Sequence, residues 1–545
     1  MKRMILGAGI SPLIDPWRRG AGLPDANLSG DTWPDAPQSE PANLIPQPNG
    51  EFDSAAGWSV ADGLTIDTVA GLAKWDGTNA ATSITAINLT QPATTGKQYG
   101  ALTAVAARTV GTQFIGFQFP GTATDGAGFT DIGHYSRQVT ATGDYAQARV
   151  YVNAGAVLDT DYLRAYDLTD MLTKKWRIVF VYSQSNWVGP GDAADRLAND
   201  PPEARAIVIP SSANNVRGSF LDAEGIGVPM LMCDPVSHLS GNVGGGPAGA
   251  FARTFCDGLR DDEVLVYVAC GYSGGGRSQP GDVWYHDGVS DGEAWTNLLK
   301  QADAMVARAP EGSTVAGCLF CQGEADLADI TGDQHTKLIR NDFEFLRSRY
   351  GNFPIVVSEI GWQDTARADV ANMIASQAKL DSNSGDPLSL PLCRYVPRPS
   401  GSTFLADTLH YDQPTCRVRG DLAATALLEL FYGPDPRFTL TAGTDGGSGI
   451  GYSDGTLTAA FGAISSEPVE GQLLLFVAEN GTNITAYFAG DIVSLLTGCS
   501  LVVDGVTYPA SSVTFNEGLG TNVNFTTSGG TFVDAVEYAC ALVLA

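Results

Sequence analysis

A short polar sequence at residues 183–186, Ser-Gln-Ser-Asn, follows directly on an apolar run at residues 178–182. A short run of β-branched and aromatic residues predicts a buried strand. Ligands of open α/β sheets bind at the carboxyl ends of the strands. A serine at this junction is therefore a candidate nucleophile, provided that a base and oxyanion donors come from elsewhere in the chain.

The base must be one of only five histidines. His410 follows Asp407 by three residues in the sequence Asp-Thr-Leu-His. This spacing lets a carboxylate hold one ring nitrogen while the other nitrogen faces a nucleophile. Taken alone, such a pair is more often part of a solvated loop than of a catalytic site. The remaining histidines are His238, in a loop that could line the site, and His134, His286 and His335, which have no partner pattern.

Two further strand ends could supply hydrogen-bond donors to a developing negative charge. The sequence at 267–276 is an apolar run that leads into a glycine-rich loop, whose backbone N–H groups could face an anion. No Gly-Lys-Ser/Thr follows, which excludes a phosphate-binding P-loop. The sequence at 318–326, Cys-Leu-Phe-Cys-Gln-Gly-Glu-Ala-Asp, places the Gln322 amide at the end of another apolar run, where it could donate to an oxyanion.

In this order, the four motifs resemble those of the SGNH-type hydrolases, most closely the sialate O-acetylesterase-like carbohydrate esterases. The resemblance covers residues 171–433. It implies that Ser185 is the nucleophile, His410 the general base and Asp407 the partner that orients it. The oxyanion donors that it implies are the Ser185 N–H, Gly274 (with Gly271 as the alternative) and Gln322, and the supporting residues are Glu324 and Asn186.

Two positions depart from the pattern of this family. Ser183 stands where glycine is usual and Trp187 where methionine is common, and we expect both to alter the shape of the pocket without removing the chemistry. The absence of Gly-x-Ser-x-Gly argues against the alternative α/β-hydrolase fold. The resemblance implies hydrolysis of an O-acetylated carbohydrate through an acyl-enzyme, without a metal or a cofactor.

The elements that would position these residues alternate between strands and helices. Such alternation predicts a parallel sheet with helices on both faces, and the resemblance makes it a three-layer, flavodoxin-like SGNH hydrolase domain. Residues 190–262 are expected to be irregular and to shape the mouth of the site. The expected strands are 177–182, 263–269, 314–320, 354–359 and 393–396, and the expected helices are 293–309, 333–350, 366–380 and 417–431.

The regions on either side of this domain have a different composition, so we expect a multidomain protein. Residues 1–42 are rich in Pro, Gly and Asp and are interpreted as an extended or docking segment. Short alternating runs in residues 43–170 predict a β-sandwich, and its opening resembles carbohydrate-binding jelly-roll modules. Residues 434–545 are again β-like, with Gly and Thr turns, and are expected to form a C-terminal β domain.

Charge and composition exclude several classes of partner. A formal net charge of −28 disfavours binding to nucleic acid and to anionic lipid. No apolar run approaches the roughly 20 residues of a membrane span, and the first apolar stretch is too short for a secretory signal. Nine cysteines without predicted export indicate mostly reduced thiols. The pair Cys318 and Cys321 is interpreted as buried packing rather than as a redox or zinc site.

The sequence leaves two functions open. The first is a carbohydrate O-acetylesterase whose β modules bring it to a polysaccharide. The second is a structural or receptor-binding protein that uses the hydrolase fold only to recognise a glycan. The architecture resembles bacteriophage tail fibre or tail-tip components, which implies a location in the virion, other tail proteins as partners and scope for a homo-oligomer. A bacterial esterase in the cytoplasm, or one exported by an unconventional route, is the alternative.

Overall fold

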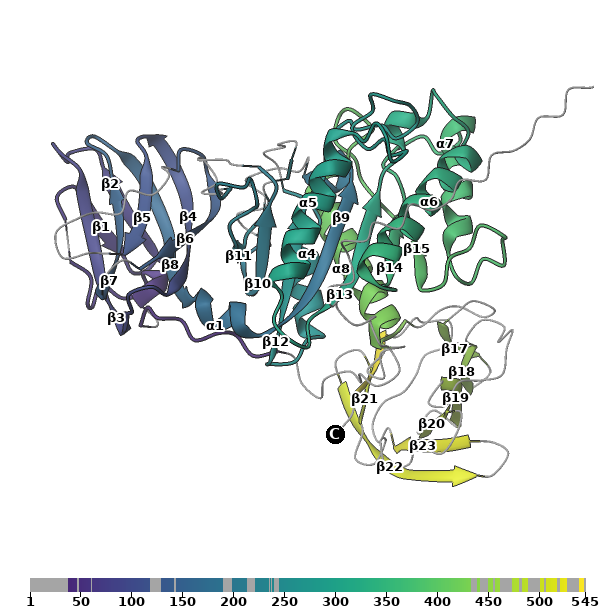
Figure 1. Ribbon diagram of the computed structural model, residues 1–545. Coiled ribbons are helices and arrows are strands. Elements are labelled where there is room, and N and C mark those ends of the chain that lie inside the picture. The colour runs from purple at the N-terminus through teal and green to yellow at the C-terminus, as the bar shows by residue number, and fades with distance from the viewer. Residues whose placement is uncertain are drawn as a thin grey trace, which may run out of the picture. The chain divides into compact units, whose positions relative to one another are not determined.

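The computed structural model describes residues 38–46, 49–59, 61–117, 129–141, 144–189, 199–212, 221–234, 236, 238–239 and 245–432, and a set of strands between residues 439 and 543. The chain divides into two compact units, residues 1–433 and 434–545 (Figure 1). All the residues singled out above for chemistry lie in the first unit.

A seven-stranded sheet forms the centre of the α/β region, in the order β11-β10-β12-β9-β13-β14-β15. Its strands are β9 (Lys175–Ser183), β10 (Glu203–Pro210), β11 (Met230–Met232), β12 (Glu263–Ala269), β13 (Thr314–Cys321), β14 (Ile355–Ser358) and β15 (Cys393–Val396). All pair in parallel except β11, which is antiparallel to β10. Numbered along the chain, the parallel strands run 2-3-1-4-5-6. The five strands that were expected from the sequence, taken alone, lie in the order β12-β9-β13-β14-β15, which is the flavodoxin-like order 2-1-3-4-5. The unexpected strands β10 and β11 extend the sheet beside β12.

Helices cover both faces of this sheet, as the alternating pattern predicts (Figure 1). Within β9, Phe180 packs in one core with α5 and α6, whereas Val179 and Val181 pack in the opposite core with α4 and α8. Because neighbouring side chains of a strand point to opposite faces, a strand buried on both sides reads as one continuous apolar run. The longer helices are α4 (Ala248–Asp257), α5 (Glu293–Arg308), α6 (Gly332–Tyr350), α7 (Ala368–Gln377) and α8 (Gln413–Tyr432), and α1 (Leu168–Thr173) and η3 (Ala378–Leu380) are shorter.

The stretch 190–262 differs from the sequence-based expectation. Its described part contributes β10, β11 and α4, so it supplies two strands and a helix of the fold rather than only irregular insertions. The fully apolar part of β10 before Pro210 is short, residues 206–209, with Arg205 in front of it and two serines after the proline. Periodicity alone cannot distinguish a buried strand of that length from a buried helix segment, so the sequence did not predict β10.

Two antiparallel sheets make up the described part of residues 49–167. One has the strand order β1-β2-β8-β4-β6 and the other β3-β7-β5. Trp75 and Leu163 from the first sheet share a buried core with Ile87 and Val150 from the second. The elements are η1 (Asn49–Glu51), β1 (Leu64–Asp67), β2 (Leu72–Asp76), β3 (Ser83–Ala93), β4 (Gln98–Val110), β5 (Gln113–Phe117), β6 (Gly133–Thr140), β7 (Tyr145–Val152) and β8 (Val157–Asp167).

The five-stranded sheet also packs against the edge strand β11 of the α/β region. Leu231 of β11 shares a buried core with Leu102 and Tyr162. The contact at Gly100 is so close that an added Cβ would lie 2.6 Å from the Leu231 side chain. These residues join the sandwich-like region and the α/β region in one unit.

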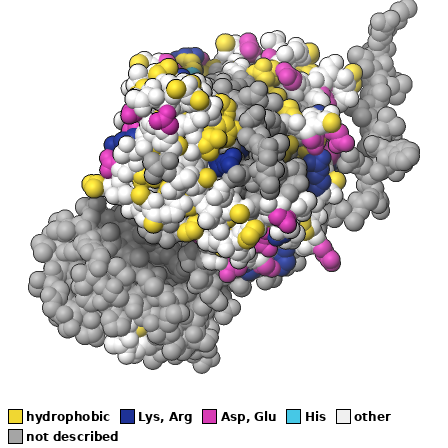
Figure 2. All heavy atoms as spheres, turned by 90° about the vertical axis from the view of Figure 1, so that its left-hand side faces the viewer, with side chains coloured by type: hydrophobic (Ala, Val, Ile, Leu, Met, Phe, Trp, Pro, Cys, Tyr) yellow, Lys and Arg dark blue, Asp and Glu magenta, His cyan; other side chains and the backbone are white. Residues whose placement is uncertain are grey.

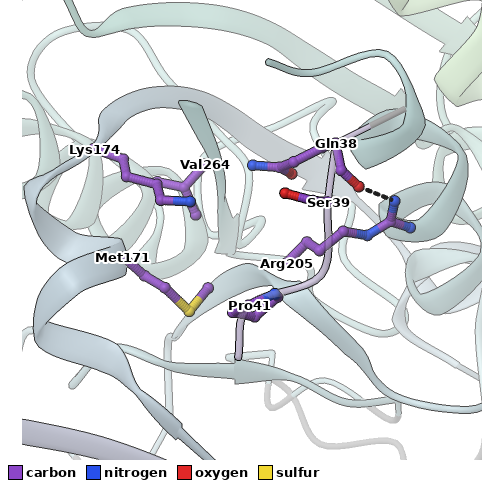
Figure 3. A pocket seen from close by; sticks show the side chains of 7 residues that line it. All are labelled: Gln38, Ser39, Pro41, Met171, Lys174, Arg205 and Val264. Atoms are coloured by element: carbon purple, nitrogen blue, oxygen red, sulfur yellow. Dashed lines mark hydrogen bonds between the residues drawn. The ribbon is translucent and has the colours of Figure 1, made fainter. Parts of the chain in front are cut away.

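The described end of the N-terminal segment lies along the α/β region near the amino ends of its strands. The Gln38 side chain donates to the Glu263 carbonyl at 2.5 Å, and Arg205 donates to the Gln38 carbonyl at 3.1 Å. A small crevice forms beside it (Figure 3). This crevice is at the opposite end of the strands from Ser185, and none of its lining residues matches the proposed chemistry. They are Gln38, Ser39, Pro41, Met171, Lys174, Arg205 and Val264.

The described part of the second unit is one nine-stranded antiparallel sheet. Its strands are β16 (Thr439–Thr441), β17 (Gly449–Ser453), β18 (Thr456–Ala460), β19 (Leu473–Glu479), β20 (Asn483–Phe488), β21 (Ser500–Val503), β22 (Val506–Asn516), β23 (Gly520–Thr526) and β24 (Ala539–Val543). In neither unit does a described helix have the length and apolar character needed to cross a membrane.

Candidate active site

The sheet topology brings three of the sequence motifs to one edge. Strand β9 lies between β12 and β13, and the candidate nucleophile, the glycine-rich loop and the segment 322–326 follow the carboxyl ends of these three strands in turn. The chain continues from β12 to β13 across β9, so this edge is a point where the direction of strand addition reverses. Ligands of open α/β sheets bind at such points.

Ser185, His410 and Asp407 form a continuous hydrogen-bonded chain. Ser185 begins the short helix α2 (Ser185–Val188) and is 6% exposed. Its Oγ lies 2.7 Å from His410 Nε2, and His410 Nδ1 lies 2.6 Å from Asp407 Oδ2. The carboxylate favours the tautomer with the proton on Nδ1, which leaves Nε2 free to accept the serine proton.

The turn from Asp407 to His410 is stabilised by hydrogen bonds between its own residues. Asp407 Oδ1 accepts hydrogen bonds from the backbone N–H groups of Leu409 and His410, at 3.0 and 2.9 Å. Burial alone would raise the pKa of Asp407, but the hydrogen bonds from the His410 backbone and ring and from the Leu409 backbone outweigh it and lower the pKa to about 2. Thr408 has a φ of 61°, a conformation that is unusual for a β-branched residue and is often found at functional sites.

Asn186 and Glu324 connect the nucleophile to the rest of the site. Asn186 Nδ2 donates to Glu324 Oε1 at 2.9 Å and to the Leu409 carbonyl at 3.3 Å. Asn186 Oδ1 accepts from the Tyr411 N–H at 3.1 Å. Asn186 therefore ties the residue after the nucleophile to both sides of His410. Asn186 and Glu324 thus lie beside Ser185 and His410, and their supporting role stays a prediction.

Glu324 is held at the same position by a second donor. The Gly361 N–H donates to Glu324 Oε1 at 2.9 Å. A Cβ on Gly361 would lie 2.0 Å from Asn186 Nδ2, so only glycine allows the chain to pass this close. Burial raises the pKa of Glu324, although its hydrogen bonds with Asn186 and Gly361 oppose that effect.

Two backbone N–H groups are available as oxyanion donors. Those of Ser185 and Gly274 make no hydrogen bond within the described part of the chain. Gly274 is exposed and has a φ of 71°, and a Cβ added there would meet no atom within 4 Å. Its loop starts beside the nucleophile, because the Tyr272 N–H donates to the Ser183 carbonyl at 2.9 Å. Both N–H groups can therefore be directed to a ligand at this edge.

Gln322 and Gly271 are not placed as oxyanion donors, which corrects the sequence-based expectation. The Gln322 side chain is fully buried, and its Nε2 donates to the Gly275 carbonyl at 3.1 Å and to Asp326 Oδ2. Both of its donor hydrogens are therefore used inside the protein. The Gly271 N–H donates to His238 Nδ1 at 3.0 Å and is likewise occupied.

The two departures from the family pattern lie in the protein interior. Ser183 Oγ donates to the Cys321 carbonyl at 3.0 Å, so this hydroxyl is turned to the neighbouring strand β13 and not to His410. Trp187 is fully buried, and its Nε1 donates to the Tyr267 hydroxyl at 2.7 Å. Neither side chain shapes an open pocket in the way we expected, because both complete the core beneath the nucleophile.

The other histidines have separate places. His134 contacts the Tyr162 hydroxyl at 2.8 Å, and His286 contacts Asp291 at 2.8 Å. Burial lowers the pKa values of His238 and His335 to about 3, so both rings are neutral near neutral pH. None of these four is placed against Ser185.

Two side chains that hold the nucleophile turn were not predicted from the sequence: Gln184, and Arg419, which donates to the Asn186 carbonyl at 3.5 Å. Gln184 Oε1 accepts from the backbone N–H groups of Gly323 and Glu324, at 2.7 and 3.1 Å. Arg419 of α8 is buried, with its guanidinium 4.2 Å from the centre of the Tyr411 ring, and donates to the Glu359 carbonyl at 2.6 Å. An arginine within an otherwise apolar helix face was the available signal for the second of these.

The described cysteines are buried free thiols, and Cys318 and Cys321 are among them. This agrees with the interpretation of that pair as packing. Among the residues that the structure describes, no cluster of three or more His, Cys, Asp or Glu side chains is arranged to hold a metal ion.

The region that carries this site is similar to a known protein family. Residues 175–429 match a family model described as "Carbohydrate esterase, sialic acid-specific acetylesterase". A search of curated protein sequences gave no match.

Several solved structures are similar to the chain at low identity. NanS is 16% identical over 48% of this chain and 98% of its own, with a TM-score of 0.38. A carbohydrate acetylesterase from Xanthomonas citri is 12% identical over 85% and 93%, with a TM-score of 0.35. A family two carbohydrate esterase from Cellvibrio japonicus is 10% identical over 70% and 96%, with a TM-score of 0.30.

Proposed function

We propose that this protein is a serine esterase that removes O-acetyl groups from carbohydrate through an acyl-enzyme. The premise is that its α/β domain is an SGNH-type carbohydrate esterase domain of the sialic acid-specific acetylesterase family. The observation that carries the proposal is the hydrogen-bonded chain from Ser185 through His410 to Asp407. It provides a nucleophile, a general base and an orienting carboxylate, which together suit acyl transfer.

In the acylation step, His410 Nε2 takes the proton of Ser185 Oγ while that oxygen attacks the acetyl carbonyl. The tetrahedral oxyanion is held by the backbone N–H groups of Ser185 and Gly274. His410 then returns the proton to the sugar oxygen as the ester bond breaks, and the carbohydrate leaves with a free hydroxyl group. The negative charge of Asp407 stabilises the imidazolium that exists between these proton transfers.

In the deacylation step, water replaces the sugar. His410 removes a proton from the water, whose oxygen attacks the acetyl-Ser185 carbonyl, and the same two N–H groups hold the second oxyanion. Breakdown of this intermediate returns the proton to Ser185 Oγ and releases acetate. Each step needs only groups that lie at this edge of the sheet.

The test is a comparison of the full chain with its Ser185→Ala variant. The wild-type protein should release p-nitrophenol from p-nitrophenyl acetate and acetate from O-acetylated sugars, and the variant should lose at least about 10⁴-fold in kcat. Equal rates for the two proteins would contradict the esterase function. An inactive wild type that still binds glycan would instead favour the receptor-binding alternative.

The biological setting is part of the same proposal. We place the enzyme in a bacteriophage tail, where it deacetylates a host surface or capsular polysaccharide and contacts other tail proteins. Support comes from the strand-rich regions before and after the esterase domain and from the strong net negative charge. Detection of the protein in purified virions would test this location. A bacterial esterase acting in the cytoplasm, or exported by an unconventional route, is the competing setting.

A further inference from the structure

The two proposed oxyanion donors belong to different loops, so their separation has to be set by something outside both. Ser185 follows β9, and Gly274 follows β12. The segment 322–326, which follows β13, forms hydrogen bonds with both loops. This segment is called the bracket below.

On the nucleophile side, the bracket uses backbone and side-chain groups. Its Gly323 and Glu324 N–H groups donate to Gln184 Oε1, and its Glu324 carboxylate accepts from Asn186. Gln184 and Asn186 are the immediate neighbours of Ser185. The nucleophile is thus held to the bracket from both sides along the chain.

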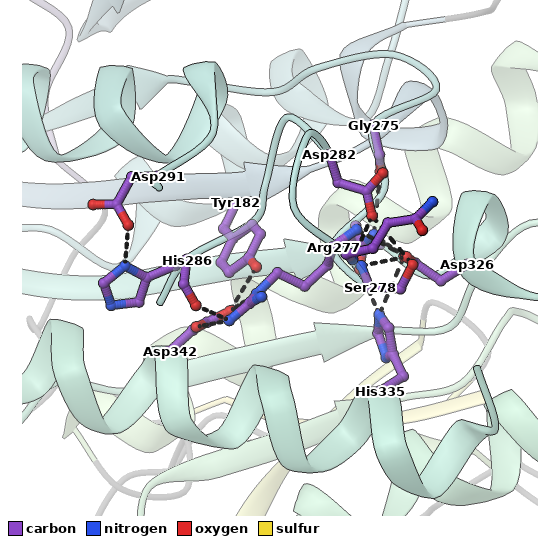
Figure 4. Close-up of polar contacts among 12 residues, drawn as sticks. Tyr182, Gly275, Arg277, Ser278, Asp282, His286, Asp291, Asp326, His335 and Asp342 are labelled. Atoms are coloured by element: carbon purple, nitrogen blue, oxygen red, sulfur yellow. Dashed lines mark hydrogen bonds and ion pairs between the residues drawn. The ribbon is translucent and has the colours of Figure 1, made fainter. Parts of the chain in front are cut away.

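On the side of the glycine-rich loop, the bracket uses Asp326 and Gln322. Asp326 Oδ1 accepts from the backbone N–H groups of Arg277 and Ser278, at 2.8 and 2.9 Å (Figure 4). Gln322 Nε2 donates to the Gly275 carbonyl at 3.1 Å. The residues that directly follow Gly274 are therefore fixed at three backbone atoms.

The orientation of the Gln322 amide follows from its neighbours. His335 is neutral because burial lowers its pKa to about 3, and its Nε2 lies 2.5 Å from Gln322 Oε1. A flipped amide would turn its oxygen toward the Gly275 carbonyl and the Asp326 carboxylate, which are both acceptors. The network thus keeps the Gln322 N–H groups pointing into the bracket and away from a substrate.

The far end of the glycine-rich loop is anchored in the core. The Arg277 guanidinium donates to both oxygens of Asp342, at 2.6 and 2.7 Å, and the Tyr182 hydroxyl donates to the same carboxylate at 2.8 Å. Both partners of this ion pair are at most 2% exposed. Figure 4 shows Arg277 extending between Tyr182 of β9 and Asp342 of α6. The loop therefore cannot move away from the bracket without breaking a buried, bidentate ion pair.

We propose that the bracket sets the spacing between the Ser185 and Gly274 N–H groups, and that Asp326 and Gln322 are positioning residues that act through the backbone of the glycine-rich loop. This inference rests on the proposed esterase function and assigns Gln322 a role different from direct donation to the oxyanion. Donors act only when they lie at hydrogen-bond distance from the place the oxyanion will occupy.

The test uses Asp326→Asn and Gln322→Ala in the full chain. Asp326→Asn places an amide donor against the Gln322 amide. Gln322→Ala removes the hydrogen bond to the Gly275 carbonyl. We expect each variant to lose about 10²-fold in kcat with little change in KM, as for a displacement of catalytic groups by about 1 Å. The double variant should lose little more than either single variant, because both changes break one network.

A tetrahedral boronate adduct provides a readout that a loss of stability alone would not change. Phenylboronic acid should bind more weakly to both variants by a factor that follows the loss in kcat, since the adduct depends on the same donors. Asp287→Asn is the matched control. Asp287 Oδ1 also accepts from two backbone N–H groups, those of Val289 and Ser290, but it lies outside the bracket, and its variant should keep the wild-type kcat.

The outcomes separate this proposal from the esterase function itself. If Ser185→Ala is inactive while Asp326→Asn keeps the wild-type kcat and boronate affinity, the esterase function stands and the bracket is wrong. A loss for Gln322→Ala without a loss for Asp326→Asn would also overturn it, in favour of direct donation by Gln322. If Asp326→Asn does not fold, Asp326→Glu keeps the charge and shifts the carboxylate by one methylene, and it must also lower kcat.

Discussion

Two histidine–aspartate pairs in this protein have nearly the same internal geometry and different surroundings. His410 Nδ1 lies 2.6 Å from Asp407, and His286 Nδ1 lies 2.8 Å from Asp291. The Nε2 of His410 faces the Ser185 hydroxyl, whereas the His286 ring stacks on Trp295 with a centroid distance of 4.5 Å. The carboxylate orients the imidazole in both pairs, but of the two rings only that of His410 faces a serine hydroxyl with its other nitrogen. The distance between the histidine nitrogen and the carboxylate is therefore a poor guide to catalysis. The group that the other ring nitrogen faces decides whether the pair can act as a base.

The largest effect expected from this comparison follows from removing each histidine in turn. His410→Ala should lower kcat by about 10⁴-fold to 10⁶-fold, because the general base of an acyl-transfer site acts as one unit with its serine. His286→Ala should keep kcat close to wild type. Steady-state hydrolysis of p-nitrophenyl acetate measures both. A strong loss for His286→Ala in a folded protein would show that the second pair takes part in the reaction.

A smaller effect is expected from the carboxylates. Asp407→Asn should lower kcat by about 10³-fold to 10⁴-fold, because an amide at this position favours the wrong tautomer of His410. Asp291→Asn removes the equivalent contact to His286 and should leave the rate unchanged. The pair of variants should be compared at a pH where the wild type is fully active. If the two substitutions had equal effects, the distinction between the pairs would fail.

The smallest effect concerns stability at low pH. The pKa of Asp407 is about 2, below the usual 3.8, so the folded state stabilises the charged form of this carboxylate. Its contribution to stability is complete above the usual pKa and is lost as the pH falls toward 2. Because the side chain is 48% exposed, the contribution is small. The urea midpoint of wild type should exceed that of Asp407→Asn at pH 6, and the gap should close near pH 2. A gap that widens on acidification would contradict the lowered pKa.

The meeting of Ser185, His410 and Asp407 could be predicted because each signal is local. Asp407 and His410 lie within one turn, and Ser185 follows a strand whose apolar run is continuous. The orientation of the Gln322 amide could not be predicted in this way. The direction of its amide depends on His335, which comes from α6, and on Asp326, which also holds the glycine-rich loop. No pattern in the 318–326 sequence specifies these longer-range partners.

The fold shows the same division between local and distant information. The strands that were expected from continuous apolar runs, such as β9, β12 and β13, were found within two residues of their expected bounds. The flavodoxin-like expectation also contained the order of the five expected strands, whereas the two added strands β10 and β11 were not predictable, because their position depends on tertiary packing rather than on any one run. The position of β10 between β11 and β12 is of this kind, and the short apolar run at 206–209 gave little indication of it.

The packing of Leu231 of β11 against Leu102 and Tyr162 has a practical consequence for protein engineering. A truncated enzyme that begins near residue 171 would retain every residue of the catalytic chain. It would also expose the outer edge of the central sheet and the apolar side chain of Leu231, which the N-terminal sheets now cover. Exposed sheet edges promote association between chains. A minimal soluble esterase should therefore retain the N-terminal sheets, or carry charged substitutions on β11, even though those sheets contribute no catalytic group.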